Sequence, residues 1–255
     1  MSPPVSWAAP VGVGLVRPDL LGTYGDAGNA AVLAQRLRWR GRPAEIVPLG
    51  PGADIPSHVR VLVLGGGEDR SQLALLDDHR LLDNVVEVVE QGAAVLGICA
   101  GLQLLGRRFL GADGETHTGL GLLDCVSDRL DDRAVGECIT EGEAGPLGAD
   151  QVTLTGFENH LGRTIVGRDS SPLGRVRIGV GNGDGTDGAV SLSGRVVGTY
   201  LHGPVLARNP ALADWILEST LGELPELHLP VVERLRQERI GAARRSHRRF
   251  RVSAR

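Results

Sequence analysis

Short apolar segments alternate with amphipathic ones through the first 110 residues, and this alternation constrains the fold more than any other feature of the chain. Apolar runs of about six residues are typical of strands that are buried on both faces. Segments with an apolar residue at every third or fourth position are typical of helices that cover such strands. The pattern therefore predicts an α/β domain with a mostly parallel central sheet flanked by helices on both faces.

The expected elements follow one another in order. Strands are predicted at 11–16, 44–47, 59–64 and 93–98, and helices at 29–39, 71–91 and 100–110. From 116 to 200 the segments shorten and are separated by Gly, Asp and Asn, which indicates short antiparallel strands or hairpins. A last apolar strand is predicted at 196–200, before a helix that begins near Asn209.

All 27 positively charged side chains are arginines, so the chain contains no lysine. Schiff-base chemistry and a P-loop both use a lysine amine, and we therefore expect neither here. The charge is also unevenly distributed. Residues 234–255 hold nine arginines and one glutamate, a net charge of +8, whereas the whole chain has a net charge of −4. An acidic body that holds few aromatic residues disfavours nucleic-acid binding.

Other functional classes are disfavoured as well. The first ten residues have no basic region, and no segment approaches the roughly 18–20 apolar residues of a membrane span. The three cysteines are too few and too irregularly spaced for a disulfide framework or a zinc site. The Gly-rich loop at 179–188 lacks the glutamate that closes a calcium loop. We expect a reduced, cytoplasmic protein with no metal and no cofactor of its own.

The most informative run extends from Gly97 to Gly101, where an apolar strand turns directly into a helix around Cys99. The two glycines permit a turn so tight that the side chain between them is exposed above the sheet, as in a nucleophile elbow. The amino terminus of the helix carries a partial positive charge that stabilises a thiolate, and its N–H groups can bind an oxyanion. The pattern favours Cys99 as a nucleophile, whereas Cys125 and Cys138 are expected to be buried apolar residues.

A thiolate nucleophile needs a base, and two of the seven histidines are candidates. His202 directly follows the last apolar strand, so it should emerge at the same sheet edge as Cys99. His160, which ends the run Gly-Phe-Glu-Asn-His, is the competing choice. We favour His202, and we expect most of the remaining histidines at the surface.

The elbow and four further motifs resemble the class I (triad) glutamine amidotransferases, and in particular their cobyric-acid-synthase-like branch. The motifs are RPDLLGTYGDAGN at 17–29, GGGEDRSQ at 65–72, GFENH at 156–160 and GTYLHGP at 198–204. Within that branch they are most similar to the glutaminase subunits of lipid II isoglutaminyl synthases. The resemblance covers residues 11–222 and implies a single flavodoxin-like glutamine amidotransferase domain.

The resemblance also implies roles for individual residues. Cys99 would attack the γ-amide of L-glutamine, with His202 as the general base and acid. Arg133 would bind the substrate, and a guanidinium can fork onto an α-carboxylate. Gln103 would line the pocket.

The implied oxyanion hole combines the backbone N–H of Ala100 with that of Gly66 or Gly67, and the sequence leaves open which glycine donates.

The catalytic triad departs from the usual class I pattern at one position. Many relatives place a glutamate two residues after the histidine, where it orients the imidazole, but this position is Pro204 here. No carboxylate follows before Asp214, so we expect the triad to be incomplete within this chain. The resemblance implies that the partner subunit supplies the carboxylate.

The implied activity is hydrolysis of L-glutamine to glutamate and ammonia through a cysteine thioester. The ammonia would pass to a Mur-ligase-like synthetase subunit, MurT, which would hold ATP and Mg²⁺ and amidate the α-carboxylate of D-glutamate in lipid II, a peptidoglycan precursor. The missing phosphate-binding lysine agrees with chemistry divided within a heterodimer. The alternatives are a glutaminase subunit for another acceptor, such as cobyrinic acid, and a catalytically silent regulatory subunit.

We expect four segments along the chain. They are an N-terminal extension at 1–10, the glutamine amidotransferase domain at 11–222, a C-terminal helix at 223–240 and a flexible basic tail at 241–255. The tail would be either a solvated extension or an arm toward an acidic partner or an anionic membrane surface.

Overall fold

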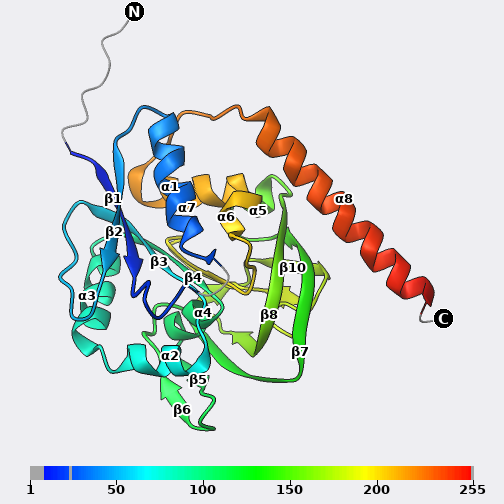
Figure 1. The fold of residues 1–255 in the computed structure, drawn as a ribbon, viewed down its shortest axis with the longest axis horizontal. Helices are drawn as coiled ribbons and strands as arrows, with labels where there is room; N and C mark the ends of the chain where they lie inside the picture. Colours follow the sequence, from blue (N-terminus) through cyan, green and yellow to red (C-terminus); the bar gives the residue numbers. More distant parts are fainter. Residues whose placement is uncertain (1–8, 23–24, 254–255) are drawn as a thin grey trace, which may run out of the picture.

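The computed structural model describes residues 9–22 and 25–253, and its core is a seven-stranded sheet (Figure 1). The strands lie in the order β2 (Ala44–Leu49), β1 (Val11–Val16), β3 (Val59–Leu64), β4 (Ala94–Ile98), β13 (Val196–Thr199), β12 (Ala189–Ser191) and β9 (Ser170–Ser171). The first five strands are parallel, and the last two are antiparallel to their neighbours. The five parallel strands have the order of a flavodoxin-like sheet, so this prediction is confirmed.

Helices cover both faces of the sheet because its central strands are apolar on both sides. Val61 and Val63 of β3 belong to one core with α1 (Gly28–Trp39), α6 (Val205–Arg208) and α7 (Pro210–Leu221). Leu62 and Leu64 of the same strand belong to a second core with α2 (Asp69–Leu76), α3 (His79–Glu90) and α4 (Ala100–Leu105). Strand periodicity therefore places alternate side chains in two separate apolar layers.

Two helices are shorter than the sequence pattern predicts. The helix expected at 71–91 is divided into α2 and α3 at Asp78, whose carboxylate accepts a hydrogen bond from the Leu81 N–H at the start of α3. The helix expected at 100–110 ends at Leu105, and the chain continues as β5 (Arg108–Leu110).

Strands between residues 108 and 187 build a second sheet. Its strands are β11 (Thr186–Asp187), β10 (Gly174–Ile178), β7 (Cys125–Gly142), β5 and β6 (Thr116–Thr118), with β8 (Thr153–Val166) paired to β7 and α5 (Gly145–Ala149) between them. The predicted antiparallel pairing is present, but β7 and β8 have 18 and 14 residues, so the expectation of only short strands is wrong. The pairing of β7 with β8 is interrupted between Arg129 and Ala134. Such a bulge redirects the side chains within it.

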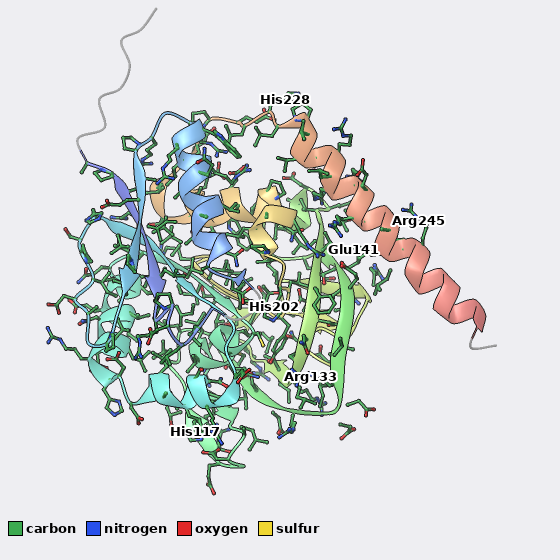
Figure 2. All side chains as sticks on the ribbon, in the orientation of Figure 1. His117, Arg133, Glu141, His202, His228 and Arg245 are labelled. Carbon is green, nitrogen blue, oxygen red and sulfur yellow. The ribbon has the colours of Figure 1, made fainter. Side chains whose placement is uncertain are left out.

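The C-terminal helix α8 (Pro230–Ser253) extends beyond the body of the molecule (Figures 1 and 2). Ile240 and Ala243 pack against Ile139 of β7. One helix thus crosses the boundary expected at residue 240, and residues 223–229 are not helical, which differs from the predicted division into a helix and a flexible tail. The expected N-terminal extension lies almost entirely outside the described residues. No helix in the described part of the chain has the length and apolarity to cross a membrane.

A buried carboxyl group connects β11 of the second sheet to β13 of the first sheet. Asp187 is fully buried, and the Thr199 hydroxyl donates a hydrogen bond at 3.2 Å to its carboxyl oxygens. Burial raises the pKa of Asp187 to about 7, because the hydrogen bond from Thr199 opposes the loss of hydration only in part and the nearby Glu158 adds repulsion.

We predict that Asp187→Asn makes the free energy of unfolding less dependent on pH. The pKa of Asp187 is higher in the folded chain than its ordinary value of 3.8, so the folded state keeps a proton that the unfolded state releases. This contribution to stability is complete below about pH 4 and is lost as the pH rises through about 7. Urea unfolding at about pH 5 and about pH 8 should show a larger loss of stability in the wild type than in the variant. Equal losses would contradict the assignment.

Candidate active site

Strands β3, β4 and β13 end side by side at one edge of the parallel sheet. Leu64 pairs with Gly97, and Ile98 pairs with Thr199. The segments that follow these strands, which contain Gly66, Cys99 and His202, therefore enter the same region. The predicted convergence of Cys99 and His202 is found there.

Cys99 occupies a strained turn between β4 and α4. Its φ of 53° lies in the left-handed region, which residues with a side chain rarely adopt. The two flanking glycines allow the turn to be this tight, because a Cβ on Gly97 would lie 2.7 Å from the backbone of Gly101. The Cys99 N–H donates to the carbonyl of Thr199 at 2.8 Å. The strand, turn and helix of a nucleophile elbow are thus present.

His202 lies next to Cys99, and only 1% of its surface is exposed. Its backbone exchanges two hydrogen bonds with Phe157 of β8, at 2.8 and 3.0 Å, which fixes its position. The ring Nδ1 lies 3.1 Å from a carboxylate oxygen of Asp26. Burial lowers the pKa of His202, but hydrogen bonds with Asp26 and Cys99 outweigh this effect and raise it to about 9. The surroundings therefore favour an imidazolium beside the sulfur.

The expectation that this chain lacks a carboxylate for His202 is wrong. Asp26 is fully buried, and it precedes α1, 176 residues before the histidine that it contacts. The usual class I glutamate stands two residues after the histidine, where this chain has Pro204. Asp26 lies in the first of the four motifs, but no spacing rule connects it to the histidine.

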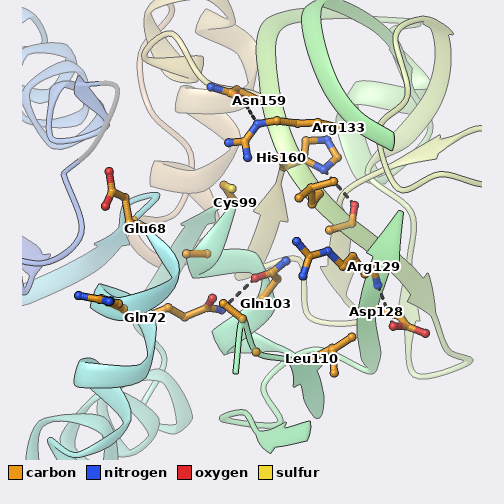
Figure 3. Close-up of a pocket in the computed structure, with 17 residues that line it drawn as sticks. Glu68, Gln72, Cys99, Gln103, Leu110, Asp128, Arg129, Arg133, Asn159 and His160 are labelled. Carbon is orange, nitrogen blue, oxygen red and sulfur yellow. Dashed lines mark hydrogen bonds between the residues drawn. The ribbon is translucent and has the colours of Figure 1, made fainter. Parts of the chain in front are cut away.

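A cavity of about 480 Å³ opens beside Cys99 (Figure 3). Of the residues expected in the site, the cavity is lined by Gly67, Cys99, Ala100, Gln103 and Arg133. The turn after β3, the elbow, the bulge in β7 and the middle of β8 all contribute residues to the cavity wall. This volume falls in the usual range for small-molecule sites, roughly 300–1,000 Å³.

The structure bears on which glycine can donate to an oxyanion. The Gly66 N–H already donates to Asp26 Oδ2 at 2.8 Å. Gly67 lines the cavity together with Ala100, the first residue of α4. Gly67 is therefore the better candidate, whereas Gly66 has a packing role. A Cβ on Gly66 would lie 2.8 Å from the His202 ring and 3.0 Å from the Asp26 carboxylate.

Arg133 lies in the bulge of β7, and its Nε donates to the side-chain oxygen of Asn159 at 2.7 Å. Figure 3 shows its guanidinium directed into the cavity, together with that of Arg129. Sequence reasoning missed Arg129 and Asn159, because only the long pairing of β7 with β8 brings these residues to the wall of the same cavity.

Gln103 forms part of the cavity wall. Its side-chain oxygen accepts a hydrogen bond from Gln72 at 2.9 Å, and its nitrogen donates to the Tyr200 hydroxyl at 3.4 Å.

His160, the competing base, stacks on Tyr200 with ring centroids 3.8 Å apart. Its Nδ1 forms a hydrogen bond with the Gly162 carbonyl. His160 therefore belongs to the wall, whereas His202 contacts Cys99. Among the described residues, no cluster of His, Cys, Asp and Glu could hold a metal ion.

We predict that a thiol reagent labels Cys99 first in the folded chain. Burial raises the pKa of Cys125 to about 12 and also raises that of Cys138, so neither forms a thiolate readily at neutral pH. Cys99 is partly exposed and lines the cavity. Peptide mass spectrometry after brief treatment with iodoacetamide measures the order, with Cys99→Ala as the control. Labelling of Cys125 at a comparable rate in the folded protein would contradict the prediction.

Comparisons with known proteins show which chains this one is similar to. The family model of the CobB/CobQ-like glutamine amidotransferase domain matches residues 12–210. The lipid II isoglutaminyl synthase (glutamine-hydrolyzing) subunit GatD of Staphylococcus aureus (strain N315) is 35% identical over 202 residues, 78% of this chain and 80% of the relative. GatD of Streptococcus pneumoniae (strain R6) is 32% identical over 228 residues, 87% of this chain and 85% of the relative. A cobyric acid synthase from Brucella canis is 37% identical over 165 residues, but the match covers 62% of this chain and 32% of the relative.

Solved structures show the same fold. A crystal structure described as a glutamine amidotransferase has a TM-score of 0.56 and 22% identity, with 82% of this chain and 98% of that chain covered. This likeness shows the fold, whereas the family is shown by the match over residues 12–210 and by the curated relatives. The chain belongs to the CobB/CobQ-like glutamine amidotransferase family.

Proposed function

We propose that this chain is the glutaminase subunit of a two-subunit lipid II isoglutaminyl synthase. The observation that carries the proposal is the placement of Cys99 at a helix amino terminus, with His202 behind it and Arg133 across the cavity. The two relatives named GatD, at 35% and 32% identity over most of the chain, support lipid II as the acceptor.

The cavity offers separate places for the two ends of L-glutamine. The guanidinium of Arg133 would bind the α-carboxylate, and Asn159 holds its Nε so that the remaining N–H groups can fork onto two oxygens. The γ-amide would then reach Cys99, and Gln103 would form the wall beside it. A substrate held at both ends has its reacting carbon fixed next to the sulfur.

The proposed reaction proceeds through a thioester. The Cys99 thiolate attacks the amide carbon, and the N–H groups of Gly67 and Ala100 bind the oxyanion that forms. His202 gives its proton to the departing nitrogen, which leaves as ammonia. Water, deprotonated by His202, then attacks the thioester, which releases glutamate and restores the Cys99 thiolate beside the protonated His202.

The ammonia would be used by a Mur-ligase-like partner, MurT, which would hold ATP and Mg²⁺ and activate the acceptor carboxylate. A chain with no lysine lacks the amine of a P-loop, which is consistent with ATP use elsewhere. The cobyric acid synthase match covers only 32% of that longer relative, so the two-subunit arrangement is the better fit. A silent regulatory subunit would have no need for His202 and Arg133 at the same cysteine.

We predict that Cys99→Ala abolishes the release of ammonia from glutamine, because no other described group at the cavity can form the thioester. Ammonia release, measured with and without the synthetase partner, tests this, with Cys125→Ala as the matched control. The same substitution should also prevent labelling by an electrophilic glutamine analogue. Retained hydrolysis in folded Cys99→Ala would overturn the proposed function.

We predict that Arg133→Gln raises the KM for glutamine roughly 10- to 100-fold with a smaller effect on kcat, since a hydrogen bond to a charged group contributes about 1.5–3 kcal/mol. Steady-state kinetics measure the two constants. Arg168→Gln is the control, because Arg168 is exposed and does not line the cavity. An unchanged KM would rule out a role for Arg133 in binding the substrate.

A further inference from the structure

We propose that the outward face of α8 binds the surface of an anionic lipid bilayer and holds the body of the molecule beside it. None of the described residues of α8 lines the cavity at Cys99, so this role is separate from glutamine hydrolysis. The choice of a membrane as the occupant rests in part on the proposed function, because an acceptor that is itself a lipid lies in a bilayer.

One face of α8 is fixed to the second sheet. Ile240 and Ala243 are each 4% exposed and pack on Ile139 of β7. One turn earlier, the guanidinium of Arg236 donates a hydrogen bond to the carbonyl of Thr153, the first residue of β8. Residues at intervals of three and four lie on one side of a helix, so these contacts leave the opposite side facing away from the sheet.

The opposite side of α8 carries arginine beside apolar side chains. Arg234 and Arg245 are exposed there, and Arg239 is exposed at its flank. Val231 and Leu235 are 59% and 54% exposed. Figure 2 shows Arg245 on the side of α8 that points away from the body. Basic and apolar side chains together on an exposed helix face are typical of helices that lie in a membrane surface.

The body offers little counter-charge to this face. Glu141 of β7 lies close to α8, but it pairs with Arg177 of β10 at 2.6 Å. Within the described part of the chain, no carboxylate forms an ion pair with Arg234, Arg239 or Arg245. These three guanidinium groups are therefore left to bind anions from outside the chain, and a guanidinium can fork onto a phosphate group.

The distribution of charge favours a lipid surface over a protein partner. Residues 246–255 add four arginines and no acid, and Glu238 is the only acid in 234–255. A protein partner would have to present an acidic groove as long as the helix, whereas every part of an anionic bilayer presents phosphates. The rest of the chain is acidic, so such a bilayer would attract α8 and repel the body, which orients the molecule.

Binding of the full chain to lipid vesicles tests the proposal. Vesicles that contain phosphatidylglycerol should sediment with the protein, whereas vesicles of phosphatidylcholine alone should not. The substitutions Arg234→Gln, Arg239→Gln and Arg245→Gln together should weaken binding about 10²-fold, because each arginine near an anionic surface strengthens binding roughly fivefold. Raising the ionic strength from about 0.1 M to about 1 M should also weaken binding, since the screening length falls from about 10 Å to about 3 Å.

Two further variants serve as controls. Arg80→Gln, Arg108→Gln and Arg168→Gln together remove the same charge from exposed positions outside α8, and this variant should bind vesicles as the wild type does. Lysine at the three α8 positions should keep most of the binding, since the potential of a bilayer acts on charge. Ammonia release in solution should be unchanged in all of these variants, because none of the substituted residues lines the cavity.

The outcomes separate this inference from the proposed function. The membrane role is wrong if the wild type ignores anionic vesicles, binds neutral ones equally well, or binds no better than the α8 glutamine variant. If that variant instead loses only the synthetase partner, α8 is a protein-docking helix and the proposal fails. Each of these results leaves the glutaminase intact, whereas a wild type that releases no ammonia would overturn the glutaminase and leave the vesicle result standing.

Discussion

The hydrogen-bonded register of β3, β4 and β13 is the constraint on which the site depends. Because these strands are parallel and end together, the residues that follow them meet at one edge of the sheet. The register is fixed by apolar side chains on both faces, since a shift by one residue would exchange the two buried layers. The packing of the core and the placement of Cys99 beside His202 therefore have the same physical cause.

Much of this arrangement could be predicted because its signals are local. Apolar periodicity indicated the parallel sheet, and the glycines around Cys99 indicated the elbow. The position of His202 followed from the strand before it. The long pairing of β7 with β8 could not be predicted in this way, because glycine and acidic residues within the strands resemble turns. Arg129 and Asn159 were missed for the same reason, since that pairing brings both residues to the wall of the cavity.

Asp26 was missed because its contact joins residues 176 positions apart. Two buried carboxyl groups near β13 show how strongly surroundings determine chemistry. Asp187 faces hydroxyl groups and lies near Glu158, so burial dominates and its pKa rises to about 7. Asp26 instead faces an amide N–H and the imidazole of His202, which are donors suited to a negative charge. Both side chains are fully buried, so their surroundings differ only in the groups that they contact.

The packing of Gly28 against Pro204 has a consequence for how such sites diverge. A Cβ at position 28 would lie 2.4 Å from the Pro204 ring, so the two segments can approach this closely only with glycine at that position. Any side chain at position 28 must therefore be accommodated at position 204, although the two residues lie 176 positions apart in the chain.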